Sequence, residues 1–284
     1  MRLAAFALSA LLLQAAPWAR AQDAEAAGPQ ATPAEPPAPA HAEAPRDWEG
    51  ALGAILRYGP EYPGSDLRGT SASASFFVRY RRFSISNGGG FVTRRADDVL
   101  RGVGLDLSRS ERTRVGLQLR LDRGRNDGSS AGLEGLGDVR ATLRARLAAT
   151  WRLGGWRVGG GWSVDALGRG GGNLGDFGIA HEQRLSPDTV WNWGVTLTAA
   201  GDRYMQSYFG VTEAQAARTG YPVYDARAGL RDIALALGMR SELTPRWVAI
   251  GGYSRSRLLG PAADSPLTIE RNTWGLSGGL AWRF

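Results

Sequence analysis

The sequence predicts an all-β fold, a closed antiparallel transmembrane β-barrel of the outer-membrane type with about twelve strands. Apolar and polar side chains alternate after Trp48, as in strands whose successive side chains point to opposite faces. The connections between these segments alternate between short and long, which is typical of barrels with short periplasmic turns and longer outer loops. No uncharged apolar run reaches the ~18 residues that a membrane-spanning helix needs.

The N-terminal segment has the layout of a secretory signal peptide. Arg2 precedes an apolar stretch over residues 3–13, and a small-residue pattern ends at Ala21. A charged start, a short apolar region and a small-residue exit are typical of a cleaved export signal. We therefore expect residues 1–21 to be a signal peptide that directs the chain out of the cytoplasm.

The segment over residues 22–46 is rich in Ala, Pro and Glu and has no aromatic residue. Such a composition cannot bury enough apolar surface to offset the entropy lost on ordering. We expect a disordered periplasmic tether here, followed by the barrel over residues 47–284. An even number of strands would place both ends of the barrel on the periplasmic side of the outer membrane.

The composition excludes several functional classes. The chain has no Cys and only 2 His, so disulfides, thiol nucleophiles and Cys-ligated metals are excluded, and we expect no cofactor and no metal. All 34 basic residues are Arg and the net charge is +7. Because the arginines are spread along the chain and do not cluster, we expect no nucleic-acid partner.

The alternation is clearest over 137–152, where apolar side chains from Val139 to Leu153 interleave with Arg and Thr. The same pattern predicts strands over 48–58, 70–80, 82–92, 99–109, 112–123, 137–152, 155–168, 175–185, 189–201, 226–243, 246–259 and 271–284. The short turns fall near residues 81, 110–111, 154, 186–188 and 244–245. The longer loops are 59–69, 93–98, 124–136, 169–174, 202–225 and 260–270.

The phase of these strands places an excess of arginine inside the barrel. The predicted lumen charges include Arg114, Arg120, Arg140, Arg144, Arg146, Arg157, Asp165 and Glu182. One interpretation is that these charges pair across a narrow, filled interior and make it rigid. The other is a small water-filled pore that favours anions, because a ring of guanidinium groups attracts them.

A catalytic site is not expected. His181 is the one histidine of the predicted barrel, and Ser163 on a neighbouring strand is a candidate nucleophile. The strand phase places Ser163 inside and His181 outside, so the two side chains cannot meet as a catalytic dyad requires. We therefore predict a non-enzymatic protein with no catalytic residues.

The long loop over 202–225 contains a helix signal. Thr212 is a suitable N-cap, Glu213 lies near the positive end of the helix dipole, and Gly220 is a suitable stop. The helix could form a plug or contact surface, or it could be a solvated cap on the loop.

The final predicted strand has an apolar face that ends in an aromatic residue. Trp274, Leu280, Trp282 and Phe284 share this face, and the pattern resembles the recognition signal read by the barrel assembly machinery of the outer membrane. That machinery and the outer-membrane lipid are therefore expected partners.

Motifs in four loops are more distinctive than the strands. Their residues are Tyr62, Gly64, Ser65 and Asp66 in the first loop, Gly135 and Asp138 entering the sixth strand, Tyr204, Ser207, Tyr208, Phe209 and Gly210 after the ninth, and Asp264, Ser265 and Pro266 before the twelfth. These motifs resemble the MipA/OmpV family of outer-membrane barrels over about Trp48 to Phe284. The resemblance implies a non-enzymatic scaffold that links a murein hydrolase, a lytic transglycosylase, to a peptidoglycan synthase. Other members of that family are discussed as porins.

Overall fold

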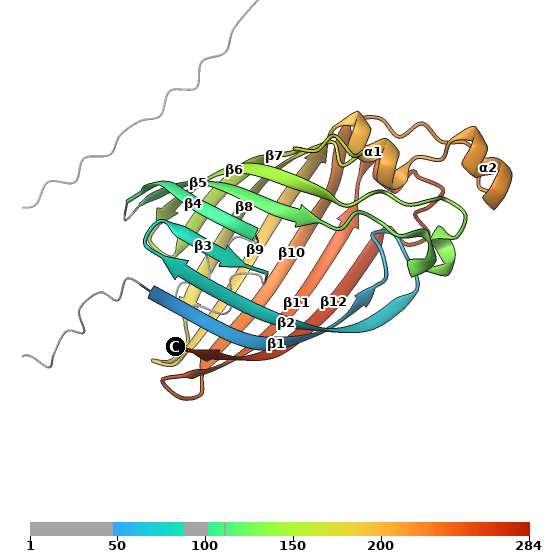
Figure 1. The fold of residues 1–284 in the computed structure, drawn as a ribbon. Coiled ribbons are helices and arrows are strands. Elements are labelled where there is room, and N and C mark those ends of the chain that lie inside the picture. The colour runs from blue at the N-terminus through green and yellow to red at the C-terminus, as the bar shows by residue number, and fades with distance from the viewer. Residues whose placement is uncertain (1–47, 88–101, 111) are drawn as a thin grey trace, which may run out of the picture. The chain divides into compact units, whose positions relative to one another are not determined.

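A computed structural model describes residues 48–87, 102–110 and 112–284. The described residues form a closed barrel of twelve strands, each paired with its sequence neighbours, with β1 beside β12 (Figure 1). The predicted fold class is confirmed. The predicted signal peptide and tether lie outside the described residues.

The strands are antiparallel throughout. They are β1 (Trp48–Pro60), β2 (Arg68–Tyr80), β3 (Phe83–Ser86), β4 (Gly102–Arg109), β5 (Thr113–Asp122), β6 (Thr142–Leu153), β7 (Trp156–Asp165), β8 (Asn173–Arg184), β9 (Thr189–Ala200), β10 (Gly229–Glu242), β11 (Trp247–Leu258) and β12 (Asn272–Arg283).

The predicted start of the sixth strand is wrong. The prediction began this strand at residue 137, whereas β6 begins at Thr142. Gly135 and Gly137 have φ values of 79° and 76°, a left-handed conformation that does not continue a strand. Arg140 therefore lies in the loop before β6, where it is exposed, and the prediction that it is a lumen residue is also wrong.

The end of the third strand also differs from the prediction. The third strand was expected to reach residue 92, but β3 ends at Ser86. The fourth strand is described from Gly102 onward, and its predicted start at residue 99 lies outside the described residues. Residues 88–101 lie outside the described part of the chain.

The outer wall of the barrel is apolar, as the alternation predicted. On β1, Leu52 and Leu56 are 52% and 59% exposed, and on β6, Leu147 and Trp151 are 52% and 50% exposed. Exposed apolar side chains on this scale are not stable against water, whereas they match the hydrocarbon of a bilayer.

Aromatic rings gather on the outer wall near the short turns. Trp156 lies edge-on to His181 and Trp193, with ring centroids 4.7 and 5.4 Å apart. At the start of β1, Trp48 packs on Tyr80, the last residue of β2. Amphipathic rings at this level are typical of the boundary between hydrocarbon and water.

The barrel closes where β1 pairs with β12, from Ala51 opposite Arg283 to Tyr58 opposite Leu276. The two backbones approach closely at this seam. A Cβ atom on Gly53 would lie 2.3 Å from the carbonyl oxygen of Leu280, and one on Gly279 would lie 2.5 Å from that of Ala54. Glycine at these two positions therefore permits the strands to pair without displacement.

The helices lie in the long loops. They are α1 (Asp202–Phe209), α2 (Glu213–Thr219) and α3 (Gly260–Ala263), with short 3-10 turns at Asp127–Ser129 and Ala131–Leu133. None of the helices in the described part of the chain is long and apolar enough to cross a membrane. The prediction of α2 is confirmed, since Thr212 and Gln215 form a capping box and Gly220 ends the helix with a φ of 75°.

We predict that Gly53→Val weakens the closed barrel. The new side chain would overlap the backbone of β12, and overpacking of this kind costs about 1–3 kcal/mol. Denaturant unfolding of the purified barrel, followed by its heat-modifiable migration on gels, measures the loss. Ala54→Val is the matched control because Ala54 faces outward from the same strand. Equal stability of the two variants would contradict the close approach at the seam.

Candidate functional site

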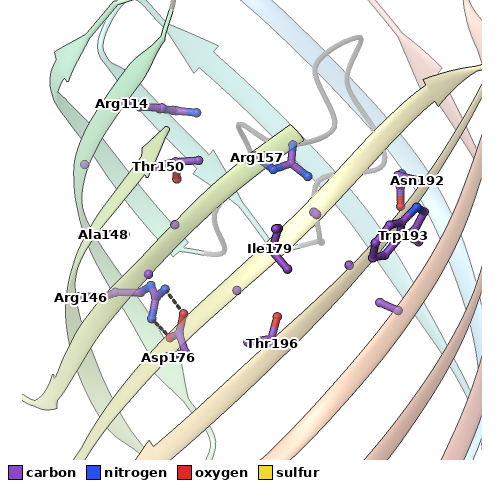
Figure 2. Close-up of a pocket in the computed structure, with 17 residues that line it drawn as sticks. Arg114, Arg146, Ala148, Thr150, Arg157, Asp176, Ile179, Asn192, Trp193 and Thr196 are labelled. Atoms are coloured by element: carbon purple, nitrogen blue, oxygen red, sulfur yellow. Dashed lines mark hydrogen bonds and ion pairs between the residues drawn. The ribbon is translucent and has the colours of Figure 1, made fainter. Parts of the chain in front are cut away.

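Arginine–carboxylate pairs join strands on the lumen side of the wall, and three of them involve arginines that were predicted to face the lumen. Arg114 Nη2 lies 2.6 Å from Asp106 Oδ1, and Arg144 Nε lies 2.9 Å from Asp122 Oδ2. Arg146 forms a bidentate pair with Asp176, in which Nη2 lies 2.8 Å from Oδ2 (Figure 2). A bidentate pair has a fixed geometry, so the contact of Arg146 with Asp176 links β6 to β8 across the intervening β7. The other two pairs link neighbouring strands.

Arg144 connects the wall of the barrel to its loops. Its side chain is fully buried, and Nη2 donates a hydrogen bond to the carbonyl oxygen of Gly171 at 2.6 Å. The guanidinium carbon lies 5.5 Å from the ring centroid of Tyr204 in α1. Because one buried cation contacts a carboxylate, a loop backbone and an aromatic face, its loss would affect all three.

Asp165, at the end of β7, organises the loop that Arg144 contacts. Thr142 donates a hydrogen bond to Asp165 Oδ1, and the amide of Gly171 donates to Oδ2 at 2.8 Å. This carboxylate therefore faces its own loop, and within the described residues it forms no ion pair with an arginine.

Other predicted lumen residues line cavities. A cavity of about 420 Å³ is bounded by Gln118, Arg120, Arg144, Arg146, Ser163, Leu174, Asp176, Thr196, Thr198 and Arg231. A second cavity of about 380 Å³ reaches Arg114, Arg157 and Asn192 (Figure 2). The two cavities share Arg146, Asp176 and Thr196, so they are adjacent along the lumen. Glu182 lines a smaller cavity of about 110 Å³ with Arg152 and Arg157.

Guanidinium groups outnumber carboxylates around the two larger cavities. Among the described residues, the first cavity is lined by Arg120, Arg144, Arg146 and Arg231 and by one carboxylate, that of Asp176. Arg120 forms no ion pair within the described residues. An uncompensated guanidinium in a narrow, water-accessible space attracts anions.

The long loops pack against each other at one end of the barrel in two apolar clusters. The first joins α1 and α3 to the ends of β9 and β11, and its buried members are Ala200, Tyr204, Met205, Phe209, Ala226, Leu258, Ala262 and Ala263. The second contains Leu133, Leu136, Val211 and Leu267, packed against Tyr62. These residues come from the loops after β1, β5, β9 and β11. We call the two clusters together the loop lid.

The motif residues of the resemblance mostly form the interior of the loop lid. Ser265 is buried, and its hydroxyl donates to the carbonyl oxygen of Phe209 at 2.6 Å. The carbonyl oxygen of Gly64 accepts hydrogen bonds from the amides of Ile269 and Glu270 at 2.8 and 2.9 Å. The contacts of Gly64 join the first and last loops across the seam. The motif residues therefore stabilise the packing of the loops in the lid.

The remaining motif residues lie around the lid. Tyr204 and Tyr208 stack with ring centroids 4.4 Å apart. The pKa of the Tyr208 phenol is raised, mainly by burial and to a lesser extent by the nearby negative charge of Asp122. Ser207 lines a loop cavity of about 260 Å³, and Gly210 ends α1. Asp66 is exposed, whereas Ser65 is buried.

Two loop contacts involve motif carboxylates. Asp138 Oδ1 accepts from the amide of Asp127 at 3.0 Å, and Asp264 pairs with Arg271 at 3.1 Å. Gly135 and Asp138 therefore lie within the loop before β6, and the prediction that they enter the sixth strand is wrong. Pro266 sits in the turn between Ser265 and the buried Leu267.

The helix α1 was not predicted. It starts at Gly201 without a side-chain cap, so it lacks the local signal that revealed α2. The sequence signal that could have predicted α1 is the helical spacing of Tyr204, Met205 and Phe209, which are all buried in the structure.

Ser163 and His181 lie on opposite faces of the wall, as the strand phase predicted. Ser163 is buried and lines the lumen cavity, whereas His181 contacts the outward rings of Trp156 and Trp193. Among the described residues no cluster of three or more His, Cys, Asp or Glu side chains could hold a metal ion.

An apolar outer wall, a charged lumen and a loop lid at one end together define a transmembrane β-barrel of the outer-membrane type. Comparison with family models then gives the particular family. The model described as "MltA-interacting protein MipA" matches residues 52–284. The chain therefore belongs to the MipA family, and the resemblance inferred from the loop motifs is confirmed.

Solved barrels align with the chain at low identity. The NanC porin is 10% identical, with a TM-score of 0.40 and coverage of 84% of this chain and 100% of that one. An outer membrane channel from Pseudomonas putida F1 is 10% identical, with a TM-score of 0.43 and coverage of 85% and 97%. An anion-selective porin from Comamonas acidovorans is 9% identical, with a TM-score of 0.37 and coverage of 84% and 98%. No curated protein sequence matches the chain.

We predict that Arg144→Gln loosens the loop lid. Removing one partner of a buried ion pair costs about 3–5 kcal/mol, and the contact with Tyr204 is lost as well. Limited trypsin digestion should cut faster at Arg203, Arg218 and Arg227, and thermal unfolding should occur at a lower temperature. Arg120→Gln is the matched control, since it removes a lumen arginine without an ion pair. Equal cleavage rates for the two variants would show that Arg144 does not hold the lid.

Proposed function

We propose that this protein is a non-enzymatic scaffold of the outer membrane that binds a murein hydrolase on its periplasmic side. The family description names an interaction with MltA, and a lytic transglycosylase of that class is the proposed partner. The proposal extends to a peptidoglycan synthase. The scaffold would bring this synthase and the hydrolase together during cell-wall growth. The short turns face the periplasm in this proposal, together with both ends of the barrel.

The observation that carries this proposal is the charge on the turn end of the barrel. Within the described turns, Arg81, Arg82, Arg112 and Arg246 are exposed, against one exposed carboxylate, Asp188. We call these four arginines the basic rim. A surface of one sign attracts a partner of the other sign and orients it during encounter, so the basic rim fits an acidic patch on the hydrolase.

The loop lid supports a role for the turn end. The loops that form the lid bury apolar residues against each other, among them Val211 at 0% and Leu267 at 2% exposure. These apolar side chains pack against each other at the loop end, whereas the arginines of the basic rim are exposed at the turn end.

A second candidate function is a small pore that favours anions. The specific observation in its favour is the pair of adjacent lumen cavities, with volumes of about 420 and 380 Å³, in which arginine exceeds carboxylate. Under this proposal the loop lid would regulate entry from the loop end.

The scaffold is tested by binding. Detergent-solubilised protein should bind purified MltA from the same organism, and Arg112→Gln with Arg246→Gln should weaken this binding about tenfold, because two attractive charges are removed from the basic rim. Higher salt should weaken it as well. The matched control is Arg218→Gln with Arg227→Gln, which removes two exposed arginines from the loop end. A larger loss in the control pair, or no binding of the hydrolase at all, would contradict the proposal.

The pore is tested by conductance. In planar bilayers the protein should show discrete steps that favour chloride over potassium, and Arg120→Glu should lower that preference by about twofold or more, because a carboxylate replaces a free guanidinium in the lumen. Arg227→Glu makes the same charge change at an exposed loop position and should leave the preference unaltered. Cation preference or the absence of discrete steps would exclude the pore.

A further inference from the structure

The outward positions of the described strands hold three charged side chains, and all three are arginines. Arg68 follows the outward phase of β2, since it continues the series of Thr70 and Ala72. Arg255 and Arg257 follow the outward phase of β11, where they lie opposite Leu235 and Ile233 of β10. The strands concerned are neighbours in the order β2, β1, β12, β11, so the charges belong to one sector of the wall.

The three arginines all lie near the loop end of the barrel. Arg68 is the first residue of β2, Arg257 lies one residue before the end of β11, and Arg255 lies two residues further in. These positions are next to the long loops, so the arginines lie near the boundary between hydrocarbon and water. An outward arginine costs about 2–4 kcal/mol at the middle of a bilayer but only about 0–1 kcal/mol near its surface.

Trp274 of β12 joins these side chains into one site. The guanidinium carbon of Arg68 lies 4.4 Å from the centroid of the Trp274 ring, and its Nη1 donates to the Trp274 carbonyl oxygen at 2.9 Å. Arg255 lies directly opposite Trp274 in the strand register, and Arg257 lies opposite Asn272. We call Arg68, Arg255, Arg257, Asn272 and Trp274 the outer arginine site.

The charge of the outer arginine site is only partly balanced. Glu270 lies 3.4 Å from Arg68, which orients that guanidinium over the ring. Arg255 and Arg257 are exposed, and neither forms an ion pair or hydrogen bond within the described residues. Two free guanidinium forks, with a third held beside an aromatic ring, match the geometry of phosphate oxygens.

We infer that the outer arginine site binds the phosphate groups of a phosphorylated glycolipid in the outer leaflet. The arginines would form charge-assisted hydrogen bonds with the phosphates, while the exposed ring of Trp274 contacts the sugar or the top of the acyl chains. This inference rests on the proposed orientation, with the long loops outward, because the phosphorylated glycolipid is the abundant anionic lipid of the outer leaflet. It is separate from the proposed partner on the turn side.

The test compares three lipids on the full-length protein in detergent micelles. The probes are bis-phosphorylated lipid A, the same lipid A without phosphates, and phosphatidylglycerol, and native mass spectrometry counts the lipid retained. We expect preferential retention of bis-phosphorylated lipid A, weakened about tenfold by Arg255→Gln with Arg257→Gln. Arg218→Gln with Arg227→Gln, at exposed loop positions away from the wall, should leave retention unaltered. Heat-modifiable migration verifies that each variant is folded.

Several outcomes would overturn the inference. Equal retention of the phosphorylated and dephosphorylated lipids would show that phosphate is not recognised. Equal retention of phosphatidylglycerol would show attraction to any anionic lipid. An unaltered affinity in the Arg255 and Arg257 variant would place the lipid elsewhere. The hydrolase-binding assay needs no glycolipid. A failure of the scaffold proposal can therefore be distinguished from a failure of the glycolipid inference.

Discussion

The structure depends on one constraint, which is that each backbone amide and carbonyl within the hydrocarbon needs a hydrogen-bond partner in the protein itself. A sheet meets this constraint only if its edges pair, and here β1 and β12 do so over eight registered positions from Ala51 to Tyr58. The close approach at Gly53 and Gly279 follows from that pairing. Once the sheet is closed, alternate side chains must face lipid or lumen, and the division of apolar and charged residues is the result.

The exclusive use of arginine among 34 basic residues suits the interior that this closure creates. Guanidinium groups form several directed hydrogen bonds at once, and Arg144 uses them on Asp122, Gly171 and Gly172 together. A lysine could bind the carboxylate but could not also serve the two carbonyl oxygens in one plane. The lumen is therefore held together by cations that act as crosslinks between strands and loops, while Arg120 keeps its charge free.

The strands and the lumen pairs could be predicted from sequence because alternation is a local pattern that barrel closure preserves. Arg114, Arg144 and Arg146 were assigned to the lumen by phase alone, and each forms its pair there. Arg140 was misplaced because the pattern continues through Gly137, whose backbone conformation the sequence pattern does not reveal. The loop lid could not be predicted in detail, since contacts such as Ser265 with Phe209 join segments that are 56 residues apart. The outward position of Arg255 also requires the register with Trp274.

The composition of the loop lid has a consequence for the order of folding. Leu133, Val211 and Leu267 belong to loops anchored at widely separated strands, and bringing such loops together has an entropic cost until their anchors are fixed. The lid clusters can therefore form only after the strands have come together, and they are absent from an open sheet. Contacts that form late act mainly by slowing unfolding. The loop lid is therefore expected to lower the unfolding rate of the inserted barrel.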